Sequence, residues 1–384
     1  MRLAFLIYRY FPFGGQQRDF LRVLKACQAK GFSITIYTMK WEGDRPKGVE
    51  ITVVPVKAWR NHTRYQKFSD WVNNKLKSEQ YDGVIGFNKM PGLDVYFAAD
   101  PCFAERALSQ RSSFYRFTAR YRHFIKFERA VFSGDSKTQV MILSPSQRQD
   151  FGKHYPESIP RLHDIPPGIS LDRKAPENVP ALKQQYREEL GFSKSDLLVL
   201  QIGSAGFQIK GVDRSLRAIA SLPDELLERS HFILLGQDKQ APFKRQAKKL
   251  GIWNRCHFLG ARDDVPKFLF AADILLHPAY SESAGYVLLE ATVAGLPVLT
   301  TDTCGYAFHI ENAHSGIVCR SPFDQNVLNK HLESMLRGED CQTFSDNGIR
   351  YGEEQDLYLM PERVADIISG LLEATPSATA GVQS

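Results

Sequence analysis

Two glutamates, Glu282 and Glu290, lie eight positions apart in a segment whose pattern suits sugar recognition. An apolar run ends at Pro278, a short polar loop follows, and a helical pattern starts after Gly285. In a strand–loop–helix unit both carboxylates would point toward the helix N-terminus, where backbone N–H groups and the helix dipole favour an anion. This arrangement favours a sugar that carries phosphate, because the N–H groups would bind phosphate and the carboxylates would bind hydroxyls.

Glutamates at this spacing also occur on ordinary amphipathic helices, so the spacing alone is weak evidence. The context strengthens it, since the first glutamate follows a Pro-containing strand end and the helix is followed by Gly-Leu-Pro-Val at 295–298. Together these features favour a binding site over a solvated helix face.

Two glycines, Gly14 and Gly15, follow the first apolar run and precede a helical pattern, so the backbone could approach a ligand there. The segment is not G-x-G-x-x-G, which makes nicotinamide binding a weak interpretation. A tight turn without a ligand would also explain the pair. Asp19, about one helical turn on, could accept a hydrogen bond from a hydroxyl or could cap the helix.

A second Gly-rich loop begins at Gly203, after an apolar run, and places Lys210 directly before a helical pattern. A cation there could neutralise a departing diphosphate, although it could also be an ordinary surface lysine. Arg173, in a Pro-rich segment, is a second candidate cation. A third strand end carries Gly260 and Arg262, which could contact a nucleotide base, whereas Asp263 could simply cap the next helix.

The sequence predicts a site without metal. It contains no Asp-x-Asp, and no cluster of His, Asp or Glu has metal-ligand spacing. The six cysteines are scattered without a C-x-x-C pair, which indicates reduced thiols rather than disulfides or zinc. We therefore expect cationic side chains and helix N-termini to stabilise any leaving group.

The elements that must position these residues follow an α/β pattern, with short apolar runs alternating with helical segments. At 384 residues the chain should form two domains. We expect two Rossmann-like halves with parallel sheets and a cleft between them, because ligands of such sheets bind at the carboxyl ends of the strands. The expected strands are 2–8, 33–38, 50–55, 83–87, 139–144, 197–202, 231–236, 256–259, 273–277 and 297–300.

These patterns also predict domain boundaries. The expected segments are an N-terminal acceptor domain at 1–165, a linker at 166–180, a C-terminal donor domain at 181–355, a helix crossing back at 356–374 and a disordered tail at 375–384. The first ten residues are interpreted as a strand rather than a signal peptide. No apolar run approaches the ~18–20 residues needed to span a bilayer.

The positive charge is concentrated between Phe103 and Phe132. This stretch holds seven Lys/Arg against two Glu, a net charge of +5 in a chain of net charge +6, together with eight aromatic residues. On a helical wheel six residues share a face, namely Phe114, Phe117, Tyr121, Phe124, Ile125 and Phe132. The pattern favours one local anionic partner, such as a membrane surface. A core-packed helix with solvated charges is the alternative, because Glu128 interrupts the apolar face.

Taken in order, these motifs resemble glycosyltransferase family 4, whose members carry an E-x7-E signature. The first half is similar to one branch of it, the lipopolysaccharide core glucosyltransferase I family. The similar segments are 8–15, 86–96, 121–123, 166–169 and 356–358. The resemblance covers nearly all of residues 1–370. It implies the GT-B architecture and metal-independent, retaining transfer of a hexose, usually glucose from UDP-glucose, to an inner-core heptose of lipopolysaccharide.

The resemblance also implies partners and site residues. It implies a UDP-sugar co-substrate and no cofactor, a lipid-linked acceptor, no nucleic acid, and a monomer on the cytoplasmic face of the inner membrane. Catalytic roles would fall on Glu282, Lys210 and Asp19. Donor binding would fall on Gly14, Gly15, Arg173, Gly203, Lys210, Gly260, Arg262, Glu282, Ala284, Gly285 and Glu290. Acceptor or membrane contacts would fall on Lys89, Asp100, Arg116, Arg120, Arg122, His123 and Lys126.

Other functions remain open at this stage. A UDP-N-acetylhexosamine transferase, a sugar-nucleotide hydrolase or epimerase, and a catalytically silent membrane-binding module would share much of this pattern. Family members usually have Arg where this chain has Gln208, so one of two expected charges is missing unless Arg173 replaces it. The sugar, the acceptor heptose and linkage, the roles of Asp19 and Asp100, and the oligomeric state are left undecided.

Overall fold

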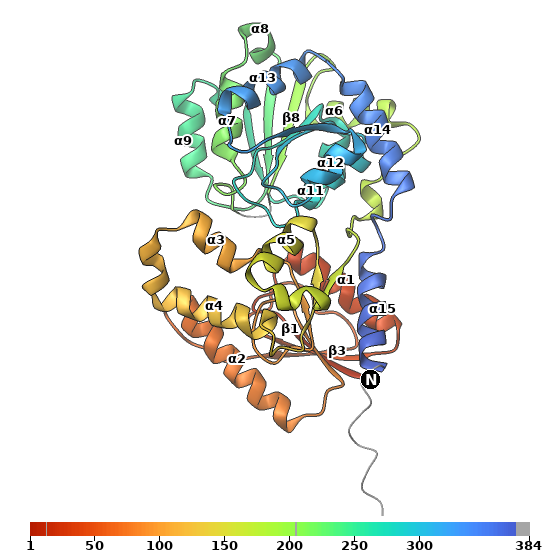
Figure 1. Cartoon of the computed structure of the whole chain (residues 1–384). Helices are drawn as coiled ribbons and strands as arrows, with labels where there is room; N and C mark the ends of the chain where they lie inside the picture. Colours follow the sequence, from red (N-terminus) through yellow and green to blue (C-terminus); the bar gives the residue numbers. More distant parts are fainter. Residues whose placement is uncertain (13, 204–205, 374–384) are drawn as a thin grey trace, which may run out of the picture. The chain divides into compact units, whose positions relative to one another are not determined.

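The computed structural model describes residues 1–12, 14–203 and 206–373 (Figure 1). The chain divides into two compact units. The first unit holds Met1–Pro166 and the segment that starts at Leu359, and the second holds Pro167–Tyr358. The predicted linker 166–180 therefore falls almost wholly within the second unit, and the predicted disordered tail at 375–384 lies outside the described residues.

The first unit is built on a seven-stranded sheet whose paired strands run parallel in the order β3-β2-β1-β4-β5-β6-β7. Its strands are β1 (Arg2–Leu6), β2 (Ser33–Thr38), β3 (Val49–Val53), β4 (Gly83–Gly86), β5 (Val95–Phe97), β6 (Gln139–Ile142) and β7 (Leu162–Asp164). Its helices are α1 (Gly15–Ala29), α2 (Asn61–Ser78), α3 (Phe103–Gln110), η1 (Ser113–Phe117), α4 (Ala119–Phe132), α5 (Pro145–His154), η2 (Pro156–Arg161) and α15 (Met360–Glu373).

Strand β1, an interior strand of this sheet, is apolar, as expected for a strand with both faces covered by helices. Residues 3–6 of β1 are buried, as expected for a parallel strand inside an α/β sheet. Helix α1 presents a buried stripe of Phe20, Val23, Leu24 and Cys27, the spacing of one helix face. This packing holds the loop between β1 and α1 at the carboxyl end of the sheet.

The last described helix, α15, belongs to the first unit although it follows the whole second unit in sequence. It packs against α1, and the Lys30 ammonium lies 2.7 Å from the Asp366 carboxylate. Leu372 lies against Gly83, where an added Cβ would come within 2.8 Å of its Cδ2. The chain thus closes the first unit with its C-terminal helix.

The second unit has a six-stranded sheet with strands paired in parallel in the order β10-β9-β8-β11-β12-β13. Its strands are β8 (Leu197–Ile202), β9 (Ser230–Leu235), β10 (Cys256–Gly260), β11 (Ile274–His277), β12 (Val298–Thr301) and β13 (Gly316–Cys319). The helical elements are η3 (Leu171–Arg173), α6 (Val179–Leu190), α7 (Val212–Ala220), α8 (Asp224–Leu227), α9 (Ala241–Lys249), η4 (Trp253–Arg255), α10 (Val265–Ala271), α11 (Tyr286–Val293), α12 (Ala307–Ala313), α13 (Gln325–Leu336) and α14 (Cys341–Glu354).

All ten strands predicted from the sequence correspond to strands in the structure, with small shifts at their ends. Three strands were not predicted, namely β5, β7 and β13. Each has only three or four residues, and β7 reads Leu-His-Asp, so neither length nor apolar pattern distinguishes them from loops. Within the described ranges, no helix is long and apolar enough to cross a bilayer.

Candidate active site

The site of the second unit lies where the strand order of its sheet reverses. Strands β8 and β11 are paired at the centre, and the chain leaves β8 toward one edge and β11 toward the other. In open α/β sheets, ligands bind outside the carboxyl ends of the strands at such a switch point. The Lys210 loop follows β8 and the Glu282 loop follows β11, so both predicted residues reach this point.

Two glycines allow the Lys210 loop to pack closely. A Cβ on Gly203 would lie 2.7 Å from Cδ of Lys210, so the lysine stem passes directly over the glycine. Gly211 has φ +72° and is the N-cap of α7, and a Cβ there would lie 2.0 Å from the Pro278 carbonyl oxygen. Ser204 and Ala205 of the same motif lie outside the described residues.

The ammonium group of Lys210 is paired with the Glu282 carboxylate. Both side chains are largely buried, with 17% and 22% of their surfaces exposed. His277 Nε2 lies 3.7 Å from the same carboxylate oxygen. Burial opposes ionisation of Glu282, but His277 and Lys210 outweigh it and lower its pKa to about 2. The loop therefore carries an ionised carboxylate at neutral pH.

His277 is a site residue that the sequence analysis missed. It is fully buried, and neither ring nitrogen has a hydrogen-bond partner among the described residues. Burial lowers its pKa more than Glu282 raises it, so the imidazole is neutral at pH 7. One feature of the sequence could have identified His277: it is a polar residue at the last position of an apolar strand, immediately before the Pro278 loop.

The Glu282 loop is held by backbone hydrogen bonds to the loop after β12. Glu282 donates its N–H to the Thr303 carbonyl at 3.1 Å and accepts from Gly305 N–H at 3.0 Å. Tyr306 N–H donates to the Ala284 carbonyl at 2.7 Å. Gly285, with φ +90°, is the N-cap of α11. These bonds pre-organise the carboxylate, as a binding group requires.

Glu290, the second glutamate of the motif, lies on α11 and is 5% exposed. The Arg173 Nε atom lies 4.0 Å from its carboxylate, and Nη1 of the same arginine lies 2.5 Å from Asp172. Arg173 comes from η3, within the predicted linker, and η3 contacts α11. Arg173 therefore pairs with the second glutamate of the motif as well as with its neighbour Asp172.

The third predicted segment lies at the end of β10. Gly260 adopts φ +74°, and its carbonyl accepts the Gly236 N–H at 2.7 Å. Arg262 forms two hydrogen bonds with Asp264, at 2.8 and 2.6 Å, and is 40% exposed. The alternative in which Asp263 caps the helix is wrong, because the N-cap of α10 is Asp264 and it makes no side-chain cap hydrogen bond.

In the first unit, the predicted glycine loop forms the start of α1. Gly14 is its N-cap and Gly15 its first residue, whereas Phe13 lies outside the described residues. Asp19 sits inside this helix and is 1% exposed, with Arg18 Nε 3.8 Å from its carboxylate. The alternative in which Asp19 caps the helix is therefore wrong.

Lys89, predicted to contact the acceptor, is engaged within the first unit. Its ammonium donates to Glu128 at 2.5 Å and to the Pro101 carbonyl at 2.7 Å. Asp100 lies nearby, and burial raises its pKa although Lys89 and Asn88 oppose the shift. His123 is packed 4.1 Å from the ring of Phe127, and burial, His62 and Lys126 lower its pKa to about 4. Both Lys89 and His123 thus have structural contacts.

The basic-aromatic segment 103–132 is not one continuous helix, which corrects the helical-wheel prediction. It forms α3, η1 and α4, and Thr118 is extended and caps α4. Phe114 and Phe117 are 79% exposed, whereas Phe132 is fully buried. The later part of α4 is therefore packed into the core, as the alternative to a membrane contact expected. Six of the segment's seven cations are exposed, namely Arg111, Arg116, Arg120, Arg122, Lys126 and Arg129.

Two parallel α/β sheets, each with the same central reversal, together with a lysine–glutamate pair at one reversal point, define a glycosyltransferase of the GT-B class. The comparisons with known proteins agree. Residues 183–351 match the family of glycosyl transferases group 1. The lipopolysaccharide glucosyltransferase WaaG of Escherichia coli (strain K12) is 48% identical over 374 residues, which cover 97% of this chain and 100% of WaaG. The chain belongs to the WaaG family.

Solved structures support the same assignment of fold. A crystal structure of WaaG, described as a glycosyltransferase involved in lipopolysaccharide biosynthesis, superposes with a TM-score of 0.92 over 96% of this chain and 100% of that chain. Anabaena HepE in complex with UDP-glucose has a TM-score of 0.74 at 17% identity, covering 96% of this chain and 100% of HepE. The latter likeness concerns the fold alone.

Proposed function

We propose that this enzyme transfers glucose from UDP-glucose to an inner-core heptose of lipopolysaccharide, with retention of anomeric configuration. The observation that carries the proposal is the Lys210–Glu282 pair at the switch point of the second sheet. Family membership supports glucose as the sugar, since the relative that matches along the whole chain is a lipopolysaccharide glucosyltransferase.

In this mechanism the bond between the anomeric carbon and the phosphate oxygen breaks as the acceptor oxygen bonds to the same face of the sugar. Lys210 offsets the negative charge that grows on the diphosphate, and Glu282 orients sugar hydroxyls. The departing phosphate oxygen takes the acceptor proton. Glu290 holds the ribose hydroxyls. The α-linked donor then gives an α-linked product, and a β-linked product seen by NMR would overturn the stereochemical proposal.

The decisive experiment is a panel of UDP-sugars with an acceptor lacking the outer core, read by UDP release and by mass of the product. We expect UDP-glucose to give acceptor-dependent release. A preference for a UDP-N-acetylhexosamine would replace glucose as the donor. Release that is equal with and without acceptor would instead support a sugar-nucleotide hydrolase, and interconversion of the donor sugars would support an epimerase.

We further propose that turnover needs no divalent metal, because cationic side chains take the role of a metal at the diphosphate. Activity measured after EDTA treatment should equal untreated activity. Loss of activity that magnesium or manganese restores would contradict this proposal.

We also propose that the enzyme acts as a monomer at the cytoplasmic face of the inner membrane, bound through segment 103–132. The six exposed cations of this segment could each contribute on the order of 1 kcal/mol at an anionic surface, over a screening length of about 10 Å at moderate salt. Phe114 and Phe117 in η1 add exposed aromatic rings, which suit the membrane interface.

Vesicle co-sedimentation tests this membrane contact. The variant with Arg116, Arg120, Arg122 and Lys126 all replaced by Gln should bind anionic vesicles more weakly and bind UDP normally. A control with four exposed cations replaced elsewhere in the first unit, at Lys25, Lys47, Lys67 and Lys77, should bind vesicles like the wild type. Equal wild-type binding to neutral and anionic vesicles would refute the electrostatic contact.

A further inference from the structure

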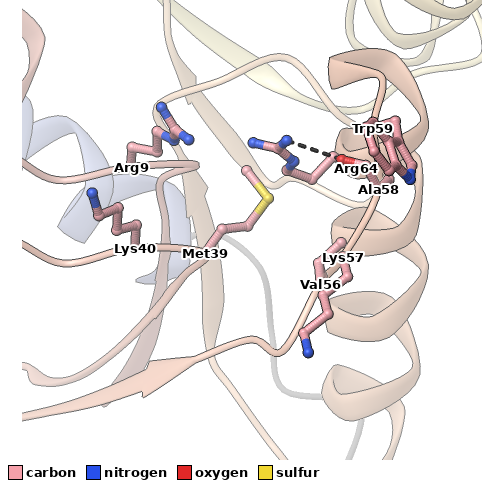
Figure 2. A pocket seen from close by; sticks show the side chains of 8 residues that line it. All are labelled: Arg9, Met39, Lys40, Val56, Lys57, Ala58, Trp59 and Arg64. Atoms are coloured by element: carbon pink, nitrogen blue, oxygen red, sulfur yellow. Dashed lines mark hydrogen bonds between the residues drawn. The ribbon is translucent and has the colours of Figure 1, made fainter.

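A cavity of about 680 Å³ lies in the first unit at the carboxyl ends of β1, β2 and β3 (Figure 2). Arg9 and Lys40 form one wall, and Lys57 and Trp59 come from the segment before α2 on the other. Arg64, on α2, directs its guanidinium group into the space between the walls (Figure 2). This is the edge at which α/β sheets bind ligands.

The cavity is strongly cationic. Four of its eight lining residues are Lys or Arg, and none of the eight is acidic. Lys40 is paired with Glu42, while Arg9 and Lys57 are exposed. Several positive charges gathered in one concave site attract an anion and raise its local concentration. Arginine and lysine together are the side chains that bind phosphate groups in proteins.

The backbone behind the cavity is held in place, so the cations are presented by a built surface. In one wall, Met39 N–H donates to the Tyr8 carbonyl at 3.1 Å and Tyr10 N–H donates to the Lys40 carbonyl at 2.9 Å. In the other wall, Arg64 donates to the Ala58 carbonyl at 2.9 Å. These bonds fix the residues on either side of the cavity before a ligand arrives.

The cavity also offers an apolar surface. Trp59 is fully exposed to solvent, which is unusual for such a large apolar side chain, and Met39 lies between the two walls. An indole ring provides a broad flat face with a polar N–H at its edge. Phosphate-binding cations beside an apolar plane match a sugar ring that carries phosphate.

We propose that this cavity binds a phosphorylated sugar of the acceptor, with the cations on the phosphate and Trp59 against the ring. The proposal deepens the function proposed above and rests on it for the identity of the acceptor. The donor-binding carboxylates and Lys210 belong to the second unit, so the cationic cavity is left for the other substrate.

The kinetic test uses deacylated inner-core oligosaccharide in two forms, with its phosphates and after chemical dephosphorylation. The double variant Arg9→Gln/Lys57→Gln should raise KM for the phosphorylated form at least ~10-fold, the loss expected when charge-assisted bonds are removed. The values of kcat and of KM for the dephosphorylated form should stay unchanged. The matched variant Lys25→Gln/Lys77→Gln should behave like the wild type. An unchanged KM in the cavity variant would overturn the proposal.

A binding measurement keeps this test separate from the proposed function. Binding of the phosphorylated oligosaccharide should change the fluorescence of Trp59, and this change should be absent in Trp59→Phe. The Kd obtained from it should rise at least ~10-fold in Arg9→Gln/Lys57→Gln. If the wild type transferred glucose to neither form of the acceptor while this fluorescence change was still seen, the proposed function would be refuted and the inference would stand. An equal signal from dephosphorylated oligosaccharide, from inorganic phosphate, or from anionic vesicles without acceptor would refute the inference.

Discussion

Lys210 and Glu282 neutralise each other in the structure, so a donor diphosphate must compete with a carboxylate for the ammonium group. This competition has a chemical consequence. When the diphosphate takes over Lys210, Glu282 regains free lone pairs that can accept hydrogen bonds from sugar hydroxyls. Neutral His277 beside it adds no repulsion to the lysine. Donor binding would thus create the hydroxyl-binding group.

Replacing Lys210 with Ala should lower kcat by about 10²–10³-fold at saturating UDP-glucose, since a group that stabilises transition-state charge is typically worth that much. UDP release measures this directly. The matched control Lys249→Ala, at an exposed position on α9, should retain wild-type turnover. Wild-type kcat in the Lys210 variant would remove its assignment as the cation at the leaving group.

Replacing Glu290 with Gln should raise KM for UDP-glucose by about tenfold, because a charged acceptor of ribose hydroxyl hydrogen bonds becomes a neutral one. Its kcat should change much less, since the ribose is distant from the breaking bond. Glu353→Gln, an exposed substitution on α14, serves as the control. Equal donor KM in both variants would remove the assignment of Glu290 to the ribose hydroxyls.

At the scale of elements, Glu128 joins helices α3 and α4 to the sheet of the first unit. Its buried carboxylate accepts from the N–H groups of Phe103 at 2.6 Å and Ala104 at 2.8 Å, at the start of α3. Lys89, from the loop after β4, the Tyr155 hydroxyl and the Cys102 thiol also donate to it. The residue that interrupts the apolar face in the sequence is therefore what holds segment 103–132 in place.

Removing this charge should destabilise the first unit strongly. Glu128→Gln leaves Lys89 buried without its partner, which costs about 3–5 kcal/mol of unfolding free energy for a buried pair. Urea unfolding followed by tryptophan fluorescence suits the test, since three of the four tryptophans lie in the first unit.

The matched control is Glu105→Gln on α3, where the carboxylate pairs with Lys153 near the surface. This change should cost about 1 kcal/mol or less. Glu128→Gln combined with Lys89→Met should recover part of the loss, because the orphaned charge is gone. Equal losses for the Glu128 and Glu105 variants would contradict the buried-pair account.

What the sequence could predict at this scale depended on local pattern. Apolar runs located every strand of four or more residues except β13, because strands buried on both faces are apolar throughout. They missed the three-residue strands β5 and β7. The same reasoning failed for 114–132, where it extended helical spacing across Thr118, an extended residue that starts a new helix. Local spacing does not reveal such a break, since Thr is tolerated in helices and in caps.

At the scale of the whole molecule, the sequence could predict the candidate site only where loops at the switch point of the sheet carry its residues. The switch-point rule places the loops of Lys210 and Glu282 together although they are 72 residues apart in sequence. No such rule joins Lys89 to Glu128 or Arg173 to Glu290, because these contacts depend on helix packing between distant segments. His277 escaped notice since a buried strand residue normally indicates packing alone.

The histidines make the stability of the whole molecule depend on pH in a defined direction. Six of the ten have a lowered pKa, chiefly from burial, and for His123 and His309 it falls to about 4. Such a residue takes up a proton in the unfolded chain near pH 6.5 but in the folded chain only at a lower pH. Protonation therefore favours unfolding, and stability falls as the pH drops from 6.5 toward 4.

His123→Phe tests this dependence, because it keeps an aromatic ring beside Phe127 and removes the proton-binding site. Between pH 7 and pH 5 the wild type should lose about 2 kcal/mol more unfolding free energy than the variant, the contribution of one histidine whose folded pKa lies well below 5. Glu79 and Glu282, with pKa values of about 2, lose their contributions as the pH falls from their unfolded value of 4.5 toward 2, which lies below this window. The same urea titration at the two pH values measures the difference. Parallel losses in wild type and variant would mean that His123 is not held neutral by its burial and its neighbours His62 and Lys126.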